Sequence, residues 1–306
     1  MQSANKVLMV RPAAFGFNPQ TAESNKFQKL VGGLKPTEIQ VKAAAEFDNL
    51  VEVLIENGVE VFAENDTPQP LKPDAIFPNN WVGFHHGKRV FLYPMLAENR
   101  RLERREDIIR NLELVYGYVP NELTDFTYLE KEGMYLEGTG SVVFDHDNQT
   151  AYCGISPRSN AKAFQLLCTS LRYQGVEFDI YDGAGFPIYH TNVMLSIGSD
   201  WIVVCFDAIP DKAQRGNLLQ SLIWTGKDII KISLEQMEKF CGNVLQLTNK
   251  EGDKLILMSD TAYKAFTTSQ MQALKSIGTK IIHVPIPTIE EHGGGSIRCM
   301  IAEMFD

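Results

Sequence analysis

The sequence predicts an α/β fold in which five similar units stack around a common axis. Short apolar runs alternate with amphipathic helical stretches along the whole chain. The order strand, hairpin, helix, strand recurs about five times, at roughly 50 to 65 residues, although the side chains do not repeat. A unit of that size cannot bury its own apolar face, so we expect the five units to pack against one another. With 306 residues and 44% hydrophobic content, the chain can bury one large core, and we expect a single domain over residues 1–306.

The first unit begins with the apolar run Val7-Leu8-Met9-Val10, which is typical of a buried strand. A helix is predicted from Pro36 to Asn57 because apolar residues recur there at helical spacing, and Asn57-Gly58 supplies a C-cap. The apolar positions of this helix are Ile39, Ala43, Phe47, Leu50 and Leu54. A second strand is predicted at residues 59–62.

The next four units each add a hairpin in front of the helix. The predicted hairpin strands are 76–84 with 90–93, 134–136 and 141–145 with 151–153, 192–197 with 201–206, and 244–246 with 255–258. The predicted helices are 101–116, 159–174, 211–225 and 269–277, and Gly175 is expected to end the second of these. Near the C-terminus, residues 300–302 predict a short buried strand with Cys299 at its start.

The composition excludes several classes of function. The chain carries 29 Lys+Arg and 38 Asp+Glu, a net charge of −9, and the basic cluster at residues 100–105 is interleaved with glutamate, so nucleic acid is not an expected partner. An apolar signal core and a run of about 18 apolar residues are both absent, which predicts a soluble, cytoplasmic protein without a membrane partner. Five scattered cysteines without a CxxC pair argue against a disulfide framework and against a metal site.

Three consecutive glycines, Gly293-Gly294-Gly295, precede Cys299. Glycine has no Cβ and free access to positive φ, so the backbone can pass close to a ligand just before it presents the thiol as a nucleophile. A glycine loop followed by an inert buried cysteine explains the same residues equally well. These residues alone do not decide between the two interpretations.

Four further motifs place polar side chains at the ends of predicted elements. They are residues 73–81 with Asp74 and Asn80, residues 136–141 with Glu137, residues 154–160 with Arg158, and residues 189–195 with His190. Each motif also has an ordinary structural explanation, namely turn chemistry, a surface glutamate before a bend, an exposed arginine, or a histidine satisfied within a strand. Taken singly, the ordinary explanation is preferred for each.

Together, however, the motifs resemble one known superfamily. The order Pro-Asp-x-x-Phe-x-x-Asn, Glu-Gly, Ser-x-Arg-Ser-Asn, His-Thr-Asn-Val and Gly-Gly-Gly-x-x-x-Cys-Met is similar to that of the guanidino-group-modifying enzymes. These include arginine deiminases, dimethylarginine hydrolases and amidinotransferases. The resemblance covers nearly the whole chain and is closest to the citrulline-utilisation hydrolases. It implies a five-bladed α/β propeller, or pentein, with pseudo-fivefold ββαβ units, in agreement with the five units described above.

The resemblance also implies roles for individual residues. Cys299 would be the catalytic nucleophile, His190 the general acid and base, and Glu137 the carboxylate that binds the guanidino or ureido nitrogens. Arg158 would bind the substrate α-carboxylate. The other residues expected to bind substrate are Asn18, Asp74, Phe77, Asn80, Arg101 and Asn192. Within the arginine cluster, the sequence leaves open whether Arg100, Arg101 or Arg104 reaches the site. No metal or organic cofactor is required.

Two departures from the arginine deiminase pattern reduce the negative charge expected at the site. Asn80 and Asn192 stand where those enzymes have carboxylates. An asparagine offers both a donor and an acceptor, so it can bind a neutral ureido group as well as a guanidino group. In addition, Asn18-Pro19 is similar to an Asn-Pro loop of the arginine dihydrolases, which remove both terminal nitrogens.

We therefore expect a cysteine-dependent hydrolase that acts on a small-molecule guanidino or ureido amino acid. Citrulline or arginine would release ammonia and give ornithine or citrulline through a covalent amidino-thioether. The alternatives are an amidinotransferase, a dimethylarginine-type hydrolase, and a non-catalytic pentein that binds a partner. The last predicts loss of the cysteine and the histidine, and both are present. The sequence leaves the oligomeric state open, including a homo-oligomer.

Overall fold

Five three-stranded sheets of identical topology form the framework of the protein. The computed structural model describes residues 1–30, 32–276 and 280–306. In each sheet the central strand pairs antiparallel with one neighbour and parallel with the other. In pairing order the sheets are β15 (Ala302–Met304), β1 (Lys6–Arg11), β2 (Glu60–Asn65); β3 (Val82–His85), β4 (Arg89–Leu92), β5 (Glu122–Asp125); β6 (Val142–Asp145), β7 (Thr150–Ile155), β8 (Gln174–Asp179); β9 (Leu195–Ile197), β10 (Trp201–Val204), β11 (Asp228–Lys231); and β12 (Leu245–Thr248), β13 (Lys254–Ser259), β14 (Lys280–Val284). This arrangement agrees with the predicted α/β fold of five repeated units.

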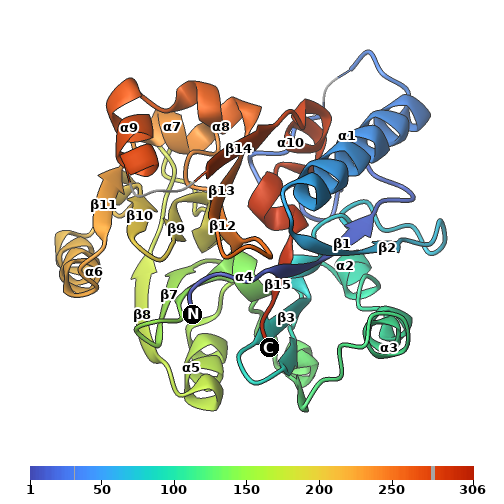
Figure 1. Ribbon diagram of the computed structural model, residues 1–306, viewed down its shortest axis with the longest axis horizontal. Coiled ribbons are helices and arrows are strands. Elements are labelled where there is room, and N and C mark those ends of the chain that lie inside the picture. Colours follow the sequence, from blue (N-terminus) through green and yellow to red (C-terminus); the bar gives the residue numbers. More distant parts are fainter. Residues whose placement is uncertain (31, 277–279) are drawn as a thin grey trace.

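Helices connect the central strand of each sheet to its parallel neighbour and also link successive sheets. They are α1 (Pro36–Glu56), α2 (Glu98–Arg101), α3 (Glu106–Leu114), α4 (Gly138–Ser141), α5 (Ala161–Leu171), α6 (Lys212–Trp224), α7 (Leu234–Glu238), α8 (Asp260–Ala265), α9 (Thr268–Ser276) and α10 (Pro287–Gly293). The helices α1, α3, α5, α6 and α9 follow one another around the periphery in chain order (Figure 1). Among the described residues, no helix is long and apolar enough to cross a membrane.

The two ends of the chain meet in the first sheet. β15 pairs with β1, with Lys6 opposite Met304, so the first and last segments lie side by side (Figure 1). The terminal strand begins at Ala302, later than the predicted 300–302, because residues 297–300 form a 3-10 turn that contains Cys299. Cys299 therefore lies in the turn before the strand.

Helix α1 follows its prediction. Pro36 occupies its first turn, where the missing N–H costs no intrahelical hydrogen bond, and Asn57 is its C-cap. All five of its predicted apolar positions are buried. Spacing alone was sufficient here because one stripe of a long helix faces the core.

Two of the predicted helices were wrong in extent. Of the predicted helix 101–116, only residues 106–114 form α3, and residue 101 ends the separate helix α2, because the chain is extended at Arg105. Helix α5 ends at Leu171 because Arg172 adopts a left-handed conformation with φ 61°, and Gly175 lies within β8. The predicted helix 269–277 corresponds to α9, and its residue 277 lies outside the described residues.

The outer strands β5, β8, β11 and β14 were not identified from the sequence. Exposed and polar residues interrupt each of them, so they lack the continuous apolar run that marked the inner strands. Each is held by parallel pairing with a central strand.

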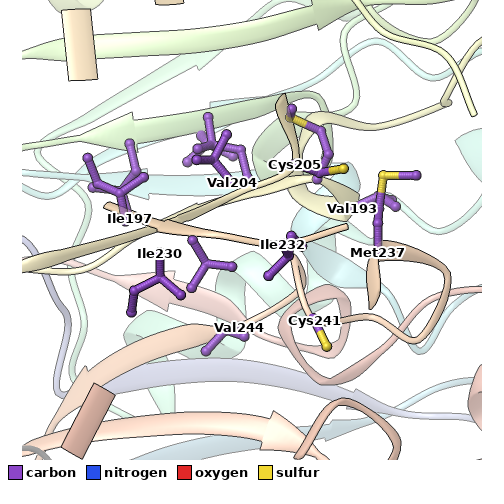
Figure 2. Packing of buried hydrophobic residues seen from close by; sticks show 14 of the residues in the cluster. Val193, Ile197, Val204, Cys205, Ile230, Ile232, Met237, Cys241 and Val244 are labelled. Carbon is purple, nitrogen blue, oxygen red and sulfur yellow. The ribbon is translucent and has the colours of Figure 1, made fainter. Parts of the chain in front are cut away.

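A buried turn precedes the first strand of each unit, and these inner turns meet. The inner turns are residues 78–80, 138–141, 191–193, 240–244 and 297–300. A Cβ on Gly138 would lie 2.1 Å from the backbone oxygen of Asn79, and a Cβ on Gly242 would lie 2.1 Å from that of Val193. Figure 2 shows part of the buried apolar cluster that includes Val193, Cys241 and Val244 beside these turns. Side chains from all five units therefore converge here.

Gly138→Ala should destabilise the fold, because residue 138 has φ +49° and no room for a Cβ. We expect the free energy of unfolding in urea to fall by about 2 to 4 kcal/mol. Gly16→Ala is the matched control, since nothing lies within 4 Å of its Cβ position. The control should change stability by less than about 0.5 kcal/mol. Equal stability of the two variants would contradict the close contact of the inner turns.

Candidate active site

A narrow cavity lies where the inner turns converge. The space within it, counted together with the solvent at its mouth, is about 260 Å³. Six residues predicted from the sequence line it: Asp74, Phe77, Asn80, Arg158, His190 and Cys299. Asn25, Arg100 and Tyr189 also line it, and none of these three was predicted. The cavity is the candidate active site because a thiol, an imidazole, carboxylate and guanidinium groups meet there.

Cys299 presents its sulfur from the inner turn 297–300 and is only 4% exposed. The side-chain NH₂ of Asn243 donates to the sulfur over 3.3 Å, and that of Asn192 lies 3.7 Å away. Burial raises the pKa of this thiol, while the backbone at Ser296, the Asn243 amide and the charge of Arg298 act in the opposite direction. Before substrate binds, Cys299 is therefore a neutral thiol at neutral pH.

His190 and Glu137 form a buried hydrogen-bonded pair with 2.8 Å between Nε2 and Oε2. Burial lowers the pKa of His190 to about 4, although Glu137 opposes this shift. Burial would raise the pKa of Glu137, but Arg158, His190 and Arg100 together hold it at about 2. At neutral pH the pair is thus a neutral imidazole and a carboxylate. His190 donates through Nε2, which leaves Nδ1 to accept a proton.

Two buried arginines lie beside Glu137. Arg158 Nη1 is 3.5 Å and Arg100 Nη1 is 3.6 Å from Glu137 Oε2. Arg100 also forms a bidentate pair with Glu103, with two nitrogen–oxygen distances of 2.9 Å. Arg158 instead donates to the hydroxyl of Ser24 over 2.7 and 2.9 Å. Its Nη2 also donates to the backbone oxygen of Thr21 over 3.2 Å. Arg100 is therefore bound by Glu103, whereas Arg158 shares Glu137 and keeps one N–H of Nη1 for a further anion.

Asp74 is a second carboxylate of the cavity and is 3% exposed. Its Oδ2 accepts a hydrogen bond from Asn18 over 2.7 Å and lies 3.6 Å from Arg100 Nε. Its Oδ1 is buried and has no hydrogen-bond partner within the described ranges. Because an unpaired buried carboxylate oxygen is costly, Oδ1 indicates where an N–H of a ligand would bind.

The glycines before Cys299 pack closely against other parts of the chain. A Cβ on Gly293 would lie 2.9 Å from the ring of Phe77, and one on Gly295 would lie 3.0 Å from it. Gly294 has φ 62° and ends α10 as a left-handed C-cap. Gly293 and Gly295 thus approach Phe77 closely and also line the cavity. The close approach of this backbone to a ligand stays a prediction.

Four predicted residues lie outside the cavity lining. Glu137 is fully buried and reaches the cavity only through its hydrogen bond to His190. The side-chain NH₂ of Asn18 donates a hydrogen bond to Asp74. The side chain of Asn192 lies beside the Cys299 sulfur and donates to the backbone oxygen of Thr139. The guanidinium of Arg101 donates to the backbone oxygens of Met95 and Leu96. Its neighbour Arg100 occupies the place in the cavity. Nothing in the charged cluster distinguished the two arginines, because both sit in one short helix.

Asn243 was missed by the sequence reasoning although it contacts Cys299. It lies in the fourth of the inner turns, two residues before β12, as Asn80 lies two residues before β3. The corresponding positions of the other three units hold Gly140, Val193 and Met300, so alignment of the units by their first strands does not single out Asn243. The unit of β12 to β14 carries no motif of the superfamily before its first strand, so no other signal was available.

Comparison with known proteins identifies the family. Residues 11–306 match the family model described as N,N dimethylarginine dimethylhydrolase, eukaryotic. The chain belongs to this family. It is therefore a member of the guanidino-group-modifying superfamily that the motifs resembled, in a family of hydrolases that act on guanidino carbon–nitrogen bonds. No curated protein sequence matches the chain.

Solved structures of similar fold include two kinds of enzyme. The N-terminal domain of ArgZ, an arginine dihydrolase from cyanobacteria, superposes with a TM-score of 0.72 at 16% identity and covers 98% of each chain. The match to the whole of ArgZ covers 98% of this chain and 40% of that one. A dimethylarginine dimethylaminohydrolase in adduct with 4-chloro-2-hydroxymethylpyridine has a TM-score of 0.65 at 15% identity and covers 99% of each chain. At these identities the likeness is one of fold.

Stability should fall on acidification, partly through His190. Its folded-state pKa of about 4 lies below the ordinary 6.5. The unfolded chain therefore takes up the proton first, and the stability present above pH 6.5 is lost as pH falls to 4. His190 should account for a loss of up to about 3 kcal/mol in the free energy of unfolding between pH 6.5 and pH 4. Urea unfolding at several pH values should show a shallower dependence for His190→Gln than for wild type. Parallel curves would contradict a neutral buried imidazole.

Proposed function

We propose that the protein hydrolyses carbon–nitrogen bonds of a guanidino or ureido amino acid, arginine or citrulline, with Cys299 as nucleophile. The observation that carries this proposal is one cavity lined by Cys299, Asp74 and His190, in which His190 is hydrogen-bonded to the buried Glu137 and one oxygen of Asp74 has no partner among the described residues. A guanidinium carbon is deactivated by resonance, so its attack requires a nucleophile better than water. Membership of a hydrolase family supports hydrolysis over other thiol chemistry.

The substrate would be held at both ends. Asp74 Oδ1 and the Glu137 carboxylate would accept N–H groups of the planar guanidino group, and Phe77 would lie against it. Arg158 would bind the α-carboxylate through the remaining N–H of its Nη1. These contacts at both ends would place the central carbon of the substrate beside the sulfur of Cys299.

The reaction would begin when the thiol transfers its proton to neutral His190. The bound guanidinium brings positive charge to the sulfur and lowers the thiol pKa. The thiolate attacks the central carbon, and protonated His190 gives its proton to the departing nitrogen, which leaves as ammonia. His190 then takes a proton from water, the resulting hydroxide adds to the same carbon, and the sulfur leaves and recovers that proton. The product oxygen then loses its remaining proton, which is carried off by the ammonia as ammonium, and a neutral ureido group is left.

Asn80 would decide how far the reaction proceeds. Its Oδ1 accepts from Arg100 over 2.8 Å, and its Nδ2 donates to Asn79 over 3.1 Å. Arginine has no acceptor, so this contact sets the orientation of the amide and leaves one NH₂ hydrogen for a ligand. A ureido oxygen can accept that hydrogen, and a citrulline-like species can then be bound and attacked again. An aspartate at this position would repel the same oxygen.

A methylated arginine is the second candidate substrate, favoured by the description of the family. It would use the same nucleophile and would release a methylamine instead of ammonia. An amidinotransferase would require an amine acceptor in place of water, which the hydrolase family disfavours. A non-catalytic binding protein is disfavoured because Cys299 and His190 face one cavity.

We also infer that the five units close into a five-bladed propeller that forms one domain over residues 1–306. The identical topology of the five sheets and the pairing of β15 with β1 support this inference. The sequential order of the outer helices around the periphery supports it as well (Figure 1).

The purified protein should release ammonia from arginine or citrulline, and Cys299→Ser should lower turnover by at least about 10³-fold, because a hydroxyl is far less ionised than a thiol. Arginine, citrulline, agmatine and methylarginines would be assayed, with products identified by mass. The variant should unfold at the wild-type midpoint. An active serine variant would exclude the covalent mechanism, and a preference for agmatine would remove the role of Arg158.

Asn80→Asp should confine the reaction to its first step. We expect kcat/KM for citrulline to fall at least about 10-fold, while arginine is still converted to citrulline. Product analysis on both substrates measures this. Asn217→Asp, at an exposed position on α6, adds the same charge elsewhere and should leave both activities unchanged. If the wild type stops at citrulline and ignores citrulline itself, the role of Asn80 fails.

A further inference from the structure

We propose that Asn243 is a positioning residue of the reaction, which orients the Cys299 sulfur and donates a hydrogen bond to it as the thiolate forms. The inference rests on the proposed function, because it takes Cys299 as the nucleophile. It assigns a role to the inner turn 240–244, which precedes β12 and carries no motif residue.

The carboxamide of Asn243 has a single permitted orientation. Its Oδ1 accepts the backbone N–H of Arg298 over 3.1 Å. A backbone nitrogen can only donate, so the amide oxygen must face Arg298 and the NH₂ must face the other way. That NH₂ donates to the backbone oxygen of Asn192 over 3.0 Å and lies 3.3 Å from the sulfur. Cys299 therefore faces an N–H donor and never the amide oxygen.

The backbone around Asn243 is constrained to hold it there. Phe240 has φ 60°, a left-handed conformation that is rare for a bulky residue. Gly242 is pressed against Val193 so closely that a Cβ would lie 2.1 Å from its backbone oxygen. Strained backbone persists only where the surrounding structure enforces it, and it concentrates at functional sites. Here the buried side chains of Val193, Cys241 and Val244 pack around the segment (Figure 2).

A neutral donor suits this reaction better than a cation would. Hydrogen bonds to an anion are stronger than those to a neutral group, so the Asn243 contact strengthens when the thiol ionises. It acts against the burial that raises the pKa of Cys299. A lysine or arginine beside the sulfur would do the same but would repel a guanidinium substrate. A carboxamide stabilises the thiolate without that repulsion.

Asn243→Asp tests the role, because it keeps an acceptor for Arg298 but replaces the NH₂ with an oxygen that repels a thiolate. The first measurement is the ultraviolet absorbance of the thiolate against pH, corrected with the same variant carrying Cys299→Ala. It uses no substrate, so it does not depend on the proposed activity. We expect the thiol titration to move up by at least about one pH unit. We also expect kcat to fall at least about 10²-fold, with KM changed less than about threefold.

Gln246→Ala is the matched control. Gln246 is another buried carboxamide of the same unit, and it is bonded to Trp201 and Ser199 rather than to sulfur. Its loss should lower the unfolding midpoint without moving the thiol titration or kcat. Asn243→Ala gives the second test if the aspartate variant fails to fold, with an upward shift in the same direction.

An unchanged titration and kcat in the Asn243 variants overturns the positioning role. A shifted titration in a protein whose wild type turns over no guanidino or ureido substrate supports the role and overturns the proposed function. The two failures are therefore distinguishable.

Discussion

The inner turns can meet only where two backbones touch with no side chain between them. Gly138 against Asn79 and Gly242 against Val193 are two such contacts, and neither leaves room for a Cβ. These contacts set how far apart the turns lie, and the turns carry His190, Asn243 and Cys299 or lie next to them. The sheets and outer helices pack around this centre. The geometry of the site therefore depends on backbone packing as much as on the polar residues themselves.

Within that centre the buried charges are paired almost completely. Glu137 is fully buried, and it stays ionised because two arginines and His190 lie against it. Glu103 in turn contacts Arg100 with both oxygens, and Arg100 acts against the burial that raises the pKa of this carboxyl to about 8. Asp74 Oδ1 and Arg298 Nη1 are buried atoms left without a hydrogen-bond partner among the described residues. Because unpaired buried charge is expensive, a cationic ligand would complete the set, which is the electrostatic reason for the affinity we propose for a guanidino group.

Carboxamides surround the reacting atoms, and they come from three different units. Asn80 contacts Arg100, while Asn192 and Asn243 lie against the sulfur. A carboxamide supplies donors and acceptors without adding charge, so the same site can hold a cationic substrate and a neutral product. A carboxamide can, however, rotate by about 180° and exchange the positions of its oxygen and its NH₂. In Asn80 and Asn243 the flip is prevented because the oxygen faces an obligate donor, an arginine in one case and a backbone N–H in the other.

The five-unit α/β plan, the inner strands and six of the residues that line the cavity could be predicted from the sequence. Apolar periodicity is a local property of a chain, and the order of the motifs can be compared with a known family without knowing which distant residues meet. The sequence could not reveal the outer strands, whose exposed residues break the apolar run, and it could not choose Arg100 over Arg101. Only the folded structure shows that Arg100 lines the cavity. It also shows that Gly293 and Gly295 pack against Phe77 and that Asn243 contacts the Cys299 sulfur. It also decided that Glu137 is ionised and His190 neutral. Each of these outcomes depends on burial and on neighbours that are distant in the chain. A local sequence pattern reveals neither the burial nor the neighbours.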